Sequence, residues 1–179
     1  GGHRRCELML GFDVVDLGPA DAPDPGETAP AFTRPLVTDE FWEDRSLSAV
    51  VDASDSPTVL VFTPMAGSFL AKYVWDELTA RGWDDRAGTV VGLTASTPYE
   101  VTQFIEDNDY PFRFFADPAN DIAESYGIVH DLDGMTGISE PRVAFFALDD
   151  DRTIESVWIA TDWPEFPDYD ELETELGLA

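Results

Sequence analysis

The sequence predicts an α/β fold in which a mixed β-sheet carries helices on both of its faces. Three observations predict this fold. Apolar runs at residues 58–63 and 88–94 have the length and the β-branched content of buried strands. Each run is followed by a segment that carries helix-capping residues. Two further apolar runs, at residues 143–148 and 154–160, flank the acidic turn at 149–152 and predict an antiparallel β-hairpin.

The helices that follow the two buried strands have recognisable ends. Ser68 is a candidate N-cap for a helix over residues 68–81. Thr97 and Glu100 have the spacing of a capping box, with a proline between them at the first helical position, and predict a helix to about residue 108. The remaining elements expected are a short strand at 112–115, a helix from Asp117 to about Gly127 and a last helix over about 169–176. Parallel strands joined through helices, with a closing hairpin, are typical of the thioredoxin-like arrangement with an insertion.

The N-terminal part of the chain has a different character. Residues 18–31 are rich in proline, glycine, alanine and aspartate, which predicts an extended loop. Phe41 and Trp42 lie among acidic residues, where we expect an irregular or short helical segment. The length of 179 residues suits one domain. We therefore expect a flexible N-terminal segment over residues 1–25 and a single domain over residues 26–179.

The chain is strongly acidic but has the composition of a folded protein. Its net charge is -27, from 37 acidic and 10 basic residues, while 44% of the residues are hydrophobic and 12% are aromatic. Lys72 is the only lysine, and the acidic residues are dispersed rather than gathered in one tail. These features predict a halophilic protein, because high salt screens the repulsion between such charges. The same charge disfavours nucleic acid and anionic membranes as partners.

Neither a membrane segment nor a disulfide is predicted. No apolar run reaches the ~20 residues of a membrane span, and no apolar signal core follows Arg4 and Arg5, so we expect a cytoplasmic protein. Cys6 is the only cysteine, which excludes an intramolecular disulfide and a CxxC pair. We interpret Cys6 as a stray residue of a frayed terminus; the alternative is a redox thiol.

Several segments of the chain, in order and at similar spacing, are typical of one family. These segments are residues 26–32 (G-x-x-A-P-x-F), 46–48, 90–98, 115–118, 123–128 (A-x-x-Y-G-I) and 142–149. Through them the chain resembles a peroxiredoxin of the alkyl hydroperoxide reductase and thiol-specific antioxidant family, over about residues 26–176. The resemblance implies a thioredoxin-like, peroxiredoxin-type fold and a thiol peroxidase as the family activity.

The resemblance also implies where the active site of such an enzyme would be. The family motif P-x-x-x-T/S-x-x-C falls on Pro64, Ser68 and Ala71, and Arg142 matches the distant arginine of the family. Alanine thus stands where the nucleophilic cysteine would be. A thiolate at a helix start is stabilised by free N–H groups and by the helix dipole, whereas alanine has no lone pair to attack a peroxide. We interpret these four positions as the vestige of a catalytic site.

Three functions therefore stay open. The first is a catalytically silent homologue that acts as a binding or assembly module for an unknown protein partner. The second is an antioxidant oxidoreductase that reduces hydroperoxides with a thiol from Cys6 or from a partner. The third is a binder of small anions at the helix N-terminus, with Ser68, Lys72 and Arg142 as ligands. The alternative is a purely structural role, in which Ser68 caps its helix and Arg142 bonds to backbone carbonyls.

No metal or cofactor is expected. His130, Asp131 and Asp133 have the spacing of neither a calcium loop nor a zinc site, so an acidic turn is the better interpretation. Pro141, which precedes Arg142, lies where thioredoxin-type folds hold a cis-proline, so a cis bond there is one alternative. Core packing is expected for most of the aromatic residues near the C-terminus, and any exposed ones would suit a homodimer face; they are Trp158, Trp163, Phe166 and Tyr169.

Overall fold

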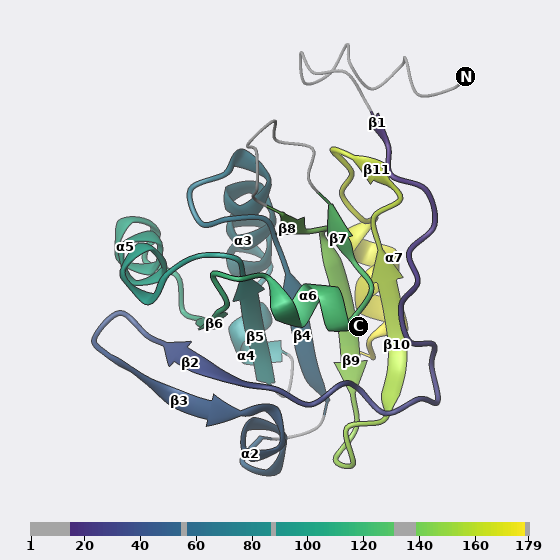
Figure 1. Ribbon diagram of the computed structural model, residues 1–179, viewed down its shortest axis with the longest axis horizontal. Helices are drawn as coiled ribbons and strands as arrows, with labels where there is room; N and C mark the ends of the chain where they lie inside the picture. The colour runs from purple at the N-terminus through teal and green to yellow at the C-terminus, as the bar shows by residue number, and fades with distance from the viewer. Residues whose placement is uncertain (1–14, 55–56, 87–88, 131–138, 178–179) are drawn as a thin grey trace.

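The computed structural model describes residues 15–54, 57–86, 89–130 and 139–177, which build a seven-stranded mixed sheet (Figure 1). The strand order is β10-β9-β4-β5-β6-β2-β3. The strands of this sheet are β2 (Thr33–Val37), β3 (Trp42–Ser46), β4 (Thr58–Phe62), β5 (Thr89–Thr94), β6 (Arg113–Ala116), β9 (Ala144–Leu148) and β10 (Ile154–Ile159). Strands β4, β5 and β6 are parallel, and β9 and β10 form the expected antiparallel hairpin.

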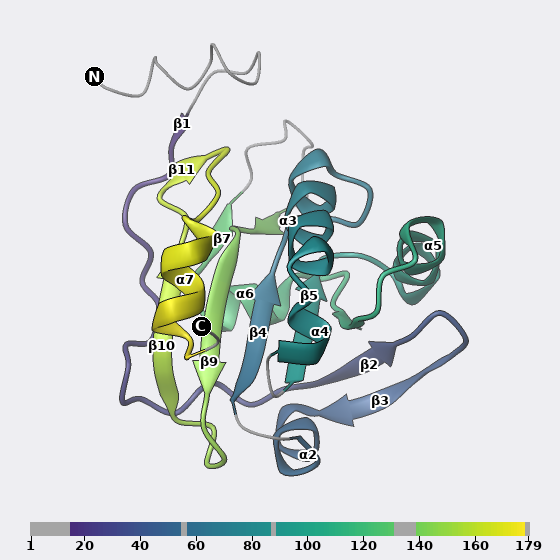
Figure 2. The same ribbon diagram turned by 180° about the vertical axis from the view of Figure 1, so that it is seen from behind.

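Helices cover both faces of the sheet, as the sequence predicts (Figures 1 and 2). The helices are α2 (Leu47–Asp52), α3 (Phe69–Ala80), α4 (Trp83–Arg86), α5 (Pro98–Asn108), α6 (Asp121–Ser125) and α7 (Tyr169–Glu175). One apolar core joins side chains of α3, α4, α5 and α7, and a second joins those of α2 and α6. Strand β4 is buried over its whole length between them, in keeping with its apolar sequence.

The helix ends follow the capping residues. The Ser68 hydroxyl accepts a hydrogen bond from the Ala71 N–H at 3.2 Å and so begins α3. At α5 the capping box is complete, because Thr97 Oγ1 accepts from Glu100 N at 3.3 Å and Glu100 Oε1 accepts from Thr97 N at 3.0 Å. The α3 helix ends before Gly82, whose φ of 69° suits glycine at that position. These local predictions are confirmed.

The sequence prediction is wrong around Phe41 and Trp42. Instead of an irregular or helical segment, β2 and β3 form an antiparallel hairpin that pairs Val37 with Trp42 and adds two strands to the sheet beyond β6. Strand β3 lies at the edge of the sheet and is exposed over its first three residues. Its residues are tryptophan, glutamate, aspartate, arginine and serine, which show no alternation of apolar and polar positions. An edge strand can lack that alternation because few of its side chains are buried.

The described part of the segment before the domain is bonded to it near residues 15–18. Strand β1 (Val15–Asp16) pairs with β11 (Asp162–Trp163), and the Leu17 N–H donates to the Thr161 carbonyl at 2.8 Å. Residues 18–31 are an extended loop, as expected. The domain boundary at residue 25 stays a prediction, and Cys6 lies outside the described residues.

Two further expectations concern the segment before Arg142. The cis peptide bond of the described chain is Trp163–Pro164, so the alternative of a cis bond before Pro141 is wrong. Strands β7 (Val129–His130) and β8 (Glu140–Pro141) pair with each other, and the acidic loop between them falls on residues 131–138, outside the described part. Among the residues that are described, no cluster of ligands could hold a metal ion, and no helix is both long and apolar enough to cross a membrane.

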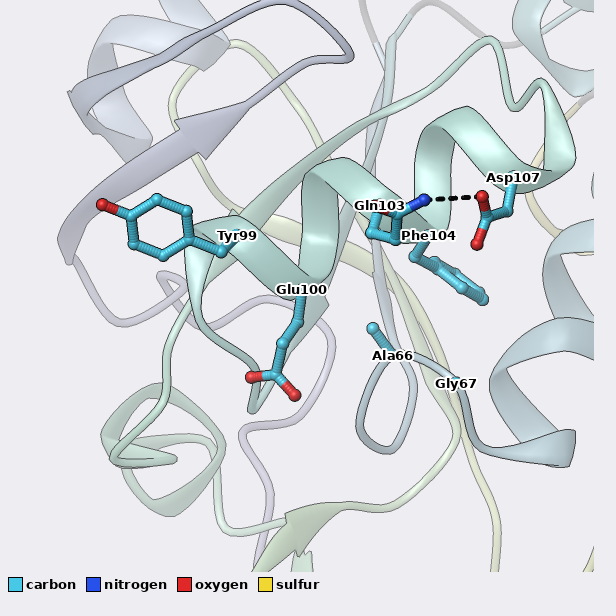
Figure 3. A pocket seen from close by; sticks show the side chains of 7 residues that line it. All are labelled: Ala66, Gly67, Tyr99, Glu100, Gln103, Phe104 and Asp107. Carbon is cyan, nitrogen blue, oxygen red and sulfur yellow. Dashed lines mark hydrogen bonds between the residues drawn. The ribbon is translucent and has the colours of Figure 1, made fainter.

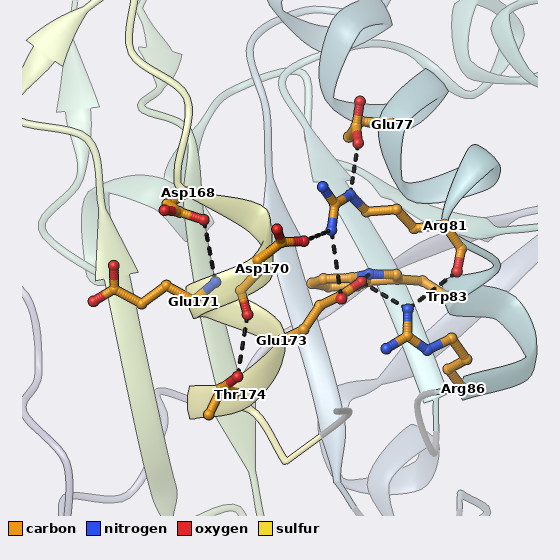
Figure 4. A network of polar contacts seen from close by, with 9 residues as sticks. All are labelled: Glu77, Arg81, Trp83, Arg86, Asp168, Asp170, Glu171, Glu173 and Thr174. Atoms are coloured by element: carbon orange, nitrogen blue, oxygen red, sulfur yellow. Dashed lines mark hydrogen bonds and ion pairs between the residues drawn. The ribbon is translucent and has the colours of Figure 1, made fainter.

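The C-terminal helix α7 is held by a buried carboxylate (Figure 4). Glu173, which is 6% exposed, accepts hydrogen bonds from Trp83 Nε1 and from Arg86 NH1, each at 2.8 Å. Arg81 lies 3.4 Å from Glu173 and also pairs with Glu77 and Asp170. The network thereby fastens α7 to the ends of α3 and α4.

Candidate functional site

The loop between β4 and α3 is fixed by side chains from two other strand ends. Thr94, at the end of β5, donates from its hydroxyl to the Pro64 carbonyl at 3.1 Å. Ser96 Oγ accepts from the Ala66 N–H at 2.8 Å, and Glu140 Oε2 accepts from the Met65 N–H at 3.0 Å. Three consecutive residues of the loop therefore have fixed partners, and Pro64 itself is buried. The backbone that leads into α3 is thus held by side chains from outside the loop.

Ala71 lies in the first turn of α3 and is fully buried. Its exposed fraction is 0%, and it belongs to the apolar core that contains Val61, Val74 and Trp75. The nearby Ser68 hydroxyl is used as the cap of the helix. The first turn of α3 therefore has a buried methyl group at residue 71. A methyl group has no lone pair with which to attack a substrate.

Arg142 is a buried side chain that binds backbone carbonyls. Its NH1 group donates to Gly18 O at 2.7 Å and to Ala160 O at 3.2 Å, and its NH2 group donates to Leu17 O at 3.0 Å. Burial lowers the pKa of the guanidinium, and the nearby charge of Asp16 opposes that shift. Arg142 thereby links the N-terminal segment to the end of β10. This is the purely structural role, bonding to backbone carbonyls, that the sequence analysis gave as an alternative.

Lys72 is exposed and has partners of its own. Its ammonium group lies 2.9 Å from Asp76 Oδ2 and 3.0 Å from Asn108 Oδ1, so it links α3 to the end of α5. Within the described chain, no side-chain hydrogen bond or ion pair joins Ser68, Lys72 and Arg142 to one another; Lys72 and Ser68 share only the backbone bond of the helix, from Lys72 N to Ser68 O at 3.1 Å. The structure thus gives each of the three predicted anion ligands a separate structural bond.

A pocket that the sequence did not indicate lies on another side of the same loop. It has a volume of about 430 Å³ and opens between the start of α3 and the side of α5 (Figure 3). Its lining residues are Ala66, Gly67, Tyr99, Glu100, Gln103, Phe104 and Asp107. The only sequence signal was an aromatic residue at the exposed start of a capped helix, which is too common to predict a pocket.

The fold and the site together define the class of protein. The mixed sheet with helices on both faces, in which α3 follows β4 through the loop at residues 63–68, is a thioredoxin-like fold of the peroxiredoxin type. The model of the AhpC/TSA family matches residues 25–157. The chain therefore belongs to the AhpC/TSA family.

Solved structures of the family have the same fold at low sequence identity. The peroxidoxin BcpB of Mycobacterium tuberculosis is 24% identical, with a TM-score of 0.63, over 86% of this chain and 94% of that chain. AhpC of Enterococcus faecalis is 17% identical, with a TM-score of 0.67, over 86% and 90% of the two chains. The reduced 2-Cys peroxiredoxin of Plasmodium vivax is 14% identical, with a TM-score of 0.70, over 86% and 94%. A comparison with curated proteins gives no match.

Proposed function

We propose that this chain is a catalytically silent member of the AhpC/TSA family that acts as a binding or assembly module. The observation that carries the proposal is Ala71, which takes the place of the nucleophile in the family motif. The thiol route that the family motif implies breaks a peroxide O–O bond by attack of a thiolate held in line with that bond. Ala71 has no sulfur, and its methyl group is buried in the core.

The other members of the vestigial site support the same proposal. Ser68 is the N-cap of α3, and Arg142 donates three hydrogen bonds to backbone carbonyls. Both side chains therefore have structural reasons to be present that need no catalysis. On this proposal, the loop from Pro64 to Ser68 would keep the backbone of the family's site, held by Thr94, Ser96 and Glu140, without its reacting atom.

The first prediction is that the protein does not turn over hydroperoxides. Hydrogen peroxide and cumene hydroperoxide, followed with dithiothreitol in molar salt, should disappear no faster with the protein than with buffer. The salt is included because the acidic composition predicts a halophilic host. The Cys6→Ser variant is the matched control, since it removes the only thiol. Turnover by both proteins, or by the native protein alone, would contradict a silent role.

A second prediction tests whether the site could be restored by one substitution. In the Cys6→Ser background, Ala71→Cys should react with a disulfide reagent at least about tenfold more slowly than free cysteine, because a thiol in an apolar core is neither accessible nor easily ionised. Ser68→Cys, in the same turn but half-buried, is the control and should react readily. A fast, low-pKa thiol at residue 71 would mean that the catalytic pocket is still intact.

Family membership favours a second candidate, an antioxidant oxidoreductase that borrows a thiol. Cys6 or a cysteine of a partner would then supply the nucleophile that Ala71 lacks. The peroxide assay tests the form of this candidate that uses Cys6, because Cys6→Ser would lose a turnover that the native protein has. The anion-binding alternative has less support, since Lys72 and Arg142 already hold other partners.

A further inference from the structure

The N-terminal segment of the described chain runs as a strap beside β10. The strap, residues 17–29, follows β1 and leads along this strand from one of its ends to the other (Figures 1 and 2). Backbone hydrogen bonds hold it at both ends, because the Leu17 N–H donates to Thr161 O and the Gly26 N–H donates to Ile154 O, each at 2.8 Å. The strap is therefore fastened before and after β10.

The middle of the strap is held by packing alone. Within the described chain, no hydrogen bond or ion pair joins residues 19–25 to a residue outside the strap. Ala20 and Ala22 pack against the second apolar core. Gly127 lies directly under this part, since a Cβ atom there would overlap the Asp21 carbonyl. The surface under the strap thus fits an extended backbone with small side chains.

Arg142 fastens one end of the strap. Its guanidinium donates to Leu17 O and Gly18 O, and also to Ala160 O of the body. This set of bonds is incomplete, because the buried Nε of Arg142 has no hydrogen-bond partner within the described chain. A buried donor without an acceptor costs free energy. The closed strap therefore leaves its own fastening partly unsatisfied.

The strap has the features of a segment that opens locally. Ala29, at its end, is the one buried residue in it, and the others are half-buried or exposed. Segments with few buried contacts and an exposed backbone open at a small cost in free energy. Pro19, Pro23 and Pro25 favour an extended conformation in the opened segment too. Opening therefore requires little rearrangement of the strap itself.

We propose that the strap covers a protein-binding surface in cis, and that an extended partner segment of small residues and prolines displaces it. Backbone carbonyls of the partner would accept from Arg142 in place of Leu17 O and Gly18 O, and its small side chains would pass over Gly127. The segment that now occupies the surface shows which chemistry fits there. This inference rests on the binding role proposed above, and it is independent of whether Ala71 is silent.

Hydrogen exchange measures the opening of the strap. In the native protein, the amides of residues 17–29 should exchange at least about tenfold faster than those of β9. Arg142→Met should accelerate exchange in the strap by a further tenfold or so and leave β4 and β5 within about twofold. The matched control is Arg45→Met, an arginine with a 40% exposed side chain, which should change neither. Equal acceleration of strap and sheet by Arg142→Met would overturn the proposal.

A peptide of the strap is the probe for the surface beneath it. The fluorescent peptide of residues 15–30 should bind saturably, by anisotropy, to the full-length protein in which Ala20→Trp and Ala22→Trp lift the strap. It should bind the native protein at least about tenfold more weakly, because the strap competes at a high effective concentration. The peptide with tryptophan at both alanine positions should not bind. Absence of saturable binding would overturn the proposal and leave the result of the peroxide assay untouched.

Salt separates this mode of binding from attraction between charges. Packing and buried backbone hydrogen bonds are little screened, so the affinity for the peptide should change less than about threefold between about 0.5 and 3 M KCl. In the native protein, an excess of the peptide should accelerate hydrogen exchange of the strap, a readout that needs no variant. An unchanged strap at saturating peptide would show that the peptide binds elsewhere, and the proposal would be wrong.

Variants locate the peptide. In the protein with the lifted strap, Arg142→Met should weaken peptide binding by about tenfold or more, because the acceptors of the peptide lose their donor. Gly127→Ala should weaken it at least as much, since the new methyl group occupies the path of the backbone. Arg45→Met is again the control and should change binding by less than about twofold. Equal weakening by all three variants would overturn the proposed surface.

Analytical ultracentrifugation tests the competing occupant, which is the strap of a second copy. The native protein should have the same oligomeric state with and without an excess of the peptide. An oligomer that the peptide dissociates would show that two copies exchange their straps, and the proposal of a partner segment would then be wrong.

Discussion

Replacing Gly92 with alanine is expected to destabilise the protein by about 3 kcal/mol. Gly92 lies in β5, between β4 and β6, and a Cβ atom there would overlap the Phe114 ring and come within 2.7 Å of Trp75 Cζ2. Phe114 is fully buried and packs against the Trp75 ring at 4.5 Å. Neither ring has free space beside it, because protein interiors are close-packed. The extra methyl group must therefore displace the sheet or the rings.

Urea unfolding at fixed salt measures this effect. Ser48→Thr adds a methyl group at an exposed position of α2 and should change the free energy of unfolding by less than about 0.5 kcal/mol. In a double-mutant cycle, Phe114→Leu should relieve part of the clash, so that Gly92→Ala costs about 1 kcal/mol less in that background. A loss for Gly92→Ala no greater than that of the surface control would show that the sheet yields easily at this point.

Loss of the Glu173 carboxylate is expected to cost about 2–3 kcal/mol. Glu173→Ala leaves the buried Trp83 N–H without its acceptor and removes the carboxylate that pairs with Arg86 (Figure 4). Breaking a fully buried ion pair costs roughly 3–5 kcal/mol. The side chains of Arg81 and Arg86 are 25% and 35% exposed, so solvent recovers part of that energy. Glu171→Ala, at an exposed position of the same helix, is the matched control and should be nearly neutral.

The same group makes stability depend on pH. Burial favours the neutral form of Glu173, but the hydrogen bonds from Trp83 and Arg86 and the charges of Arg86 and Arg81 lower its pKa below the ordinary 4.5. A carboxyl group with a lowered pKa in the folded state stabilises the protein above its unfolded pKa and loses that contribution as the pH falls. The difference in unfolding free energy between the native protein and Glu173→Ala should thus be full at pH 6–7 and shrink below about pH 4.5. A constant difference down to pH 3 would contradict this assignment.

Much of the fold is predictable because it depends on local chemistry. Residues close together in the sequence predict the succession of the central strands and helices along the chain. They also predict the caps at Ser68 and Thr97 and the final hairpin. The β2–β3 hairpin is not predictable in the same way. Its edge strand has charged residues at positions where a central strand would have apolar ones, because one of its sides has no neighbour.

The candidate site divides along the same line. The position of Ala71 in the first turn of a helix could be inferred from the motif, since Pro64 and Ser68 fix its register. The partners of the charged residues could not be inferred. Arg142 binds carbonyls more than 120 residues away in sequence, and Lys72 is paired with Asp76 and with Asn108 of another helix. The sequence analysis placed Ser68, Lys72 and Arg142 in one anion site from their residue types. It could not show that other groups of the protein already bind Lys72 and Arg142.

The amino-acid sequence by itself determined the α/β order of this chain, the start of its central helix and the methyl group at residue 71. Only the tertiary structure decided that Arg142 is bonded to backbone carbonyls and that a pocket lies between residues 66–67 and α5. The physical reason is the distance along the sequence between the residues that interact. Capping and strand formation depend on neighbours a few residues apart, whereas the partners of a charge and the walls of a cavity come from segments that meet only when the chain has folded.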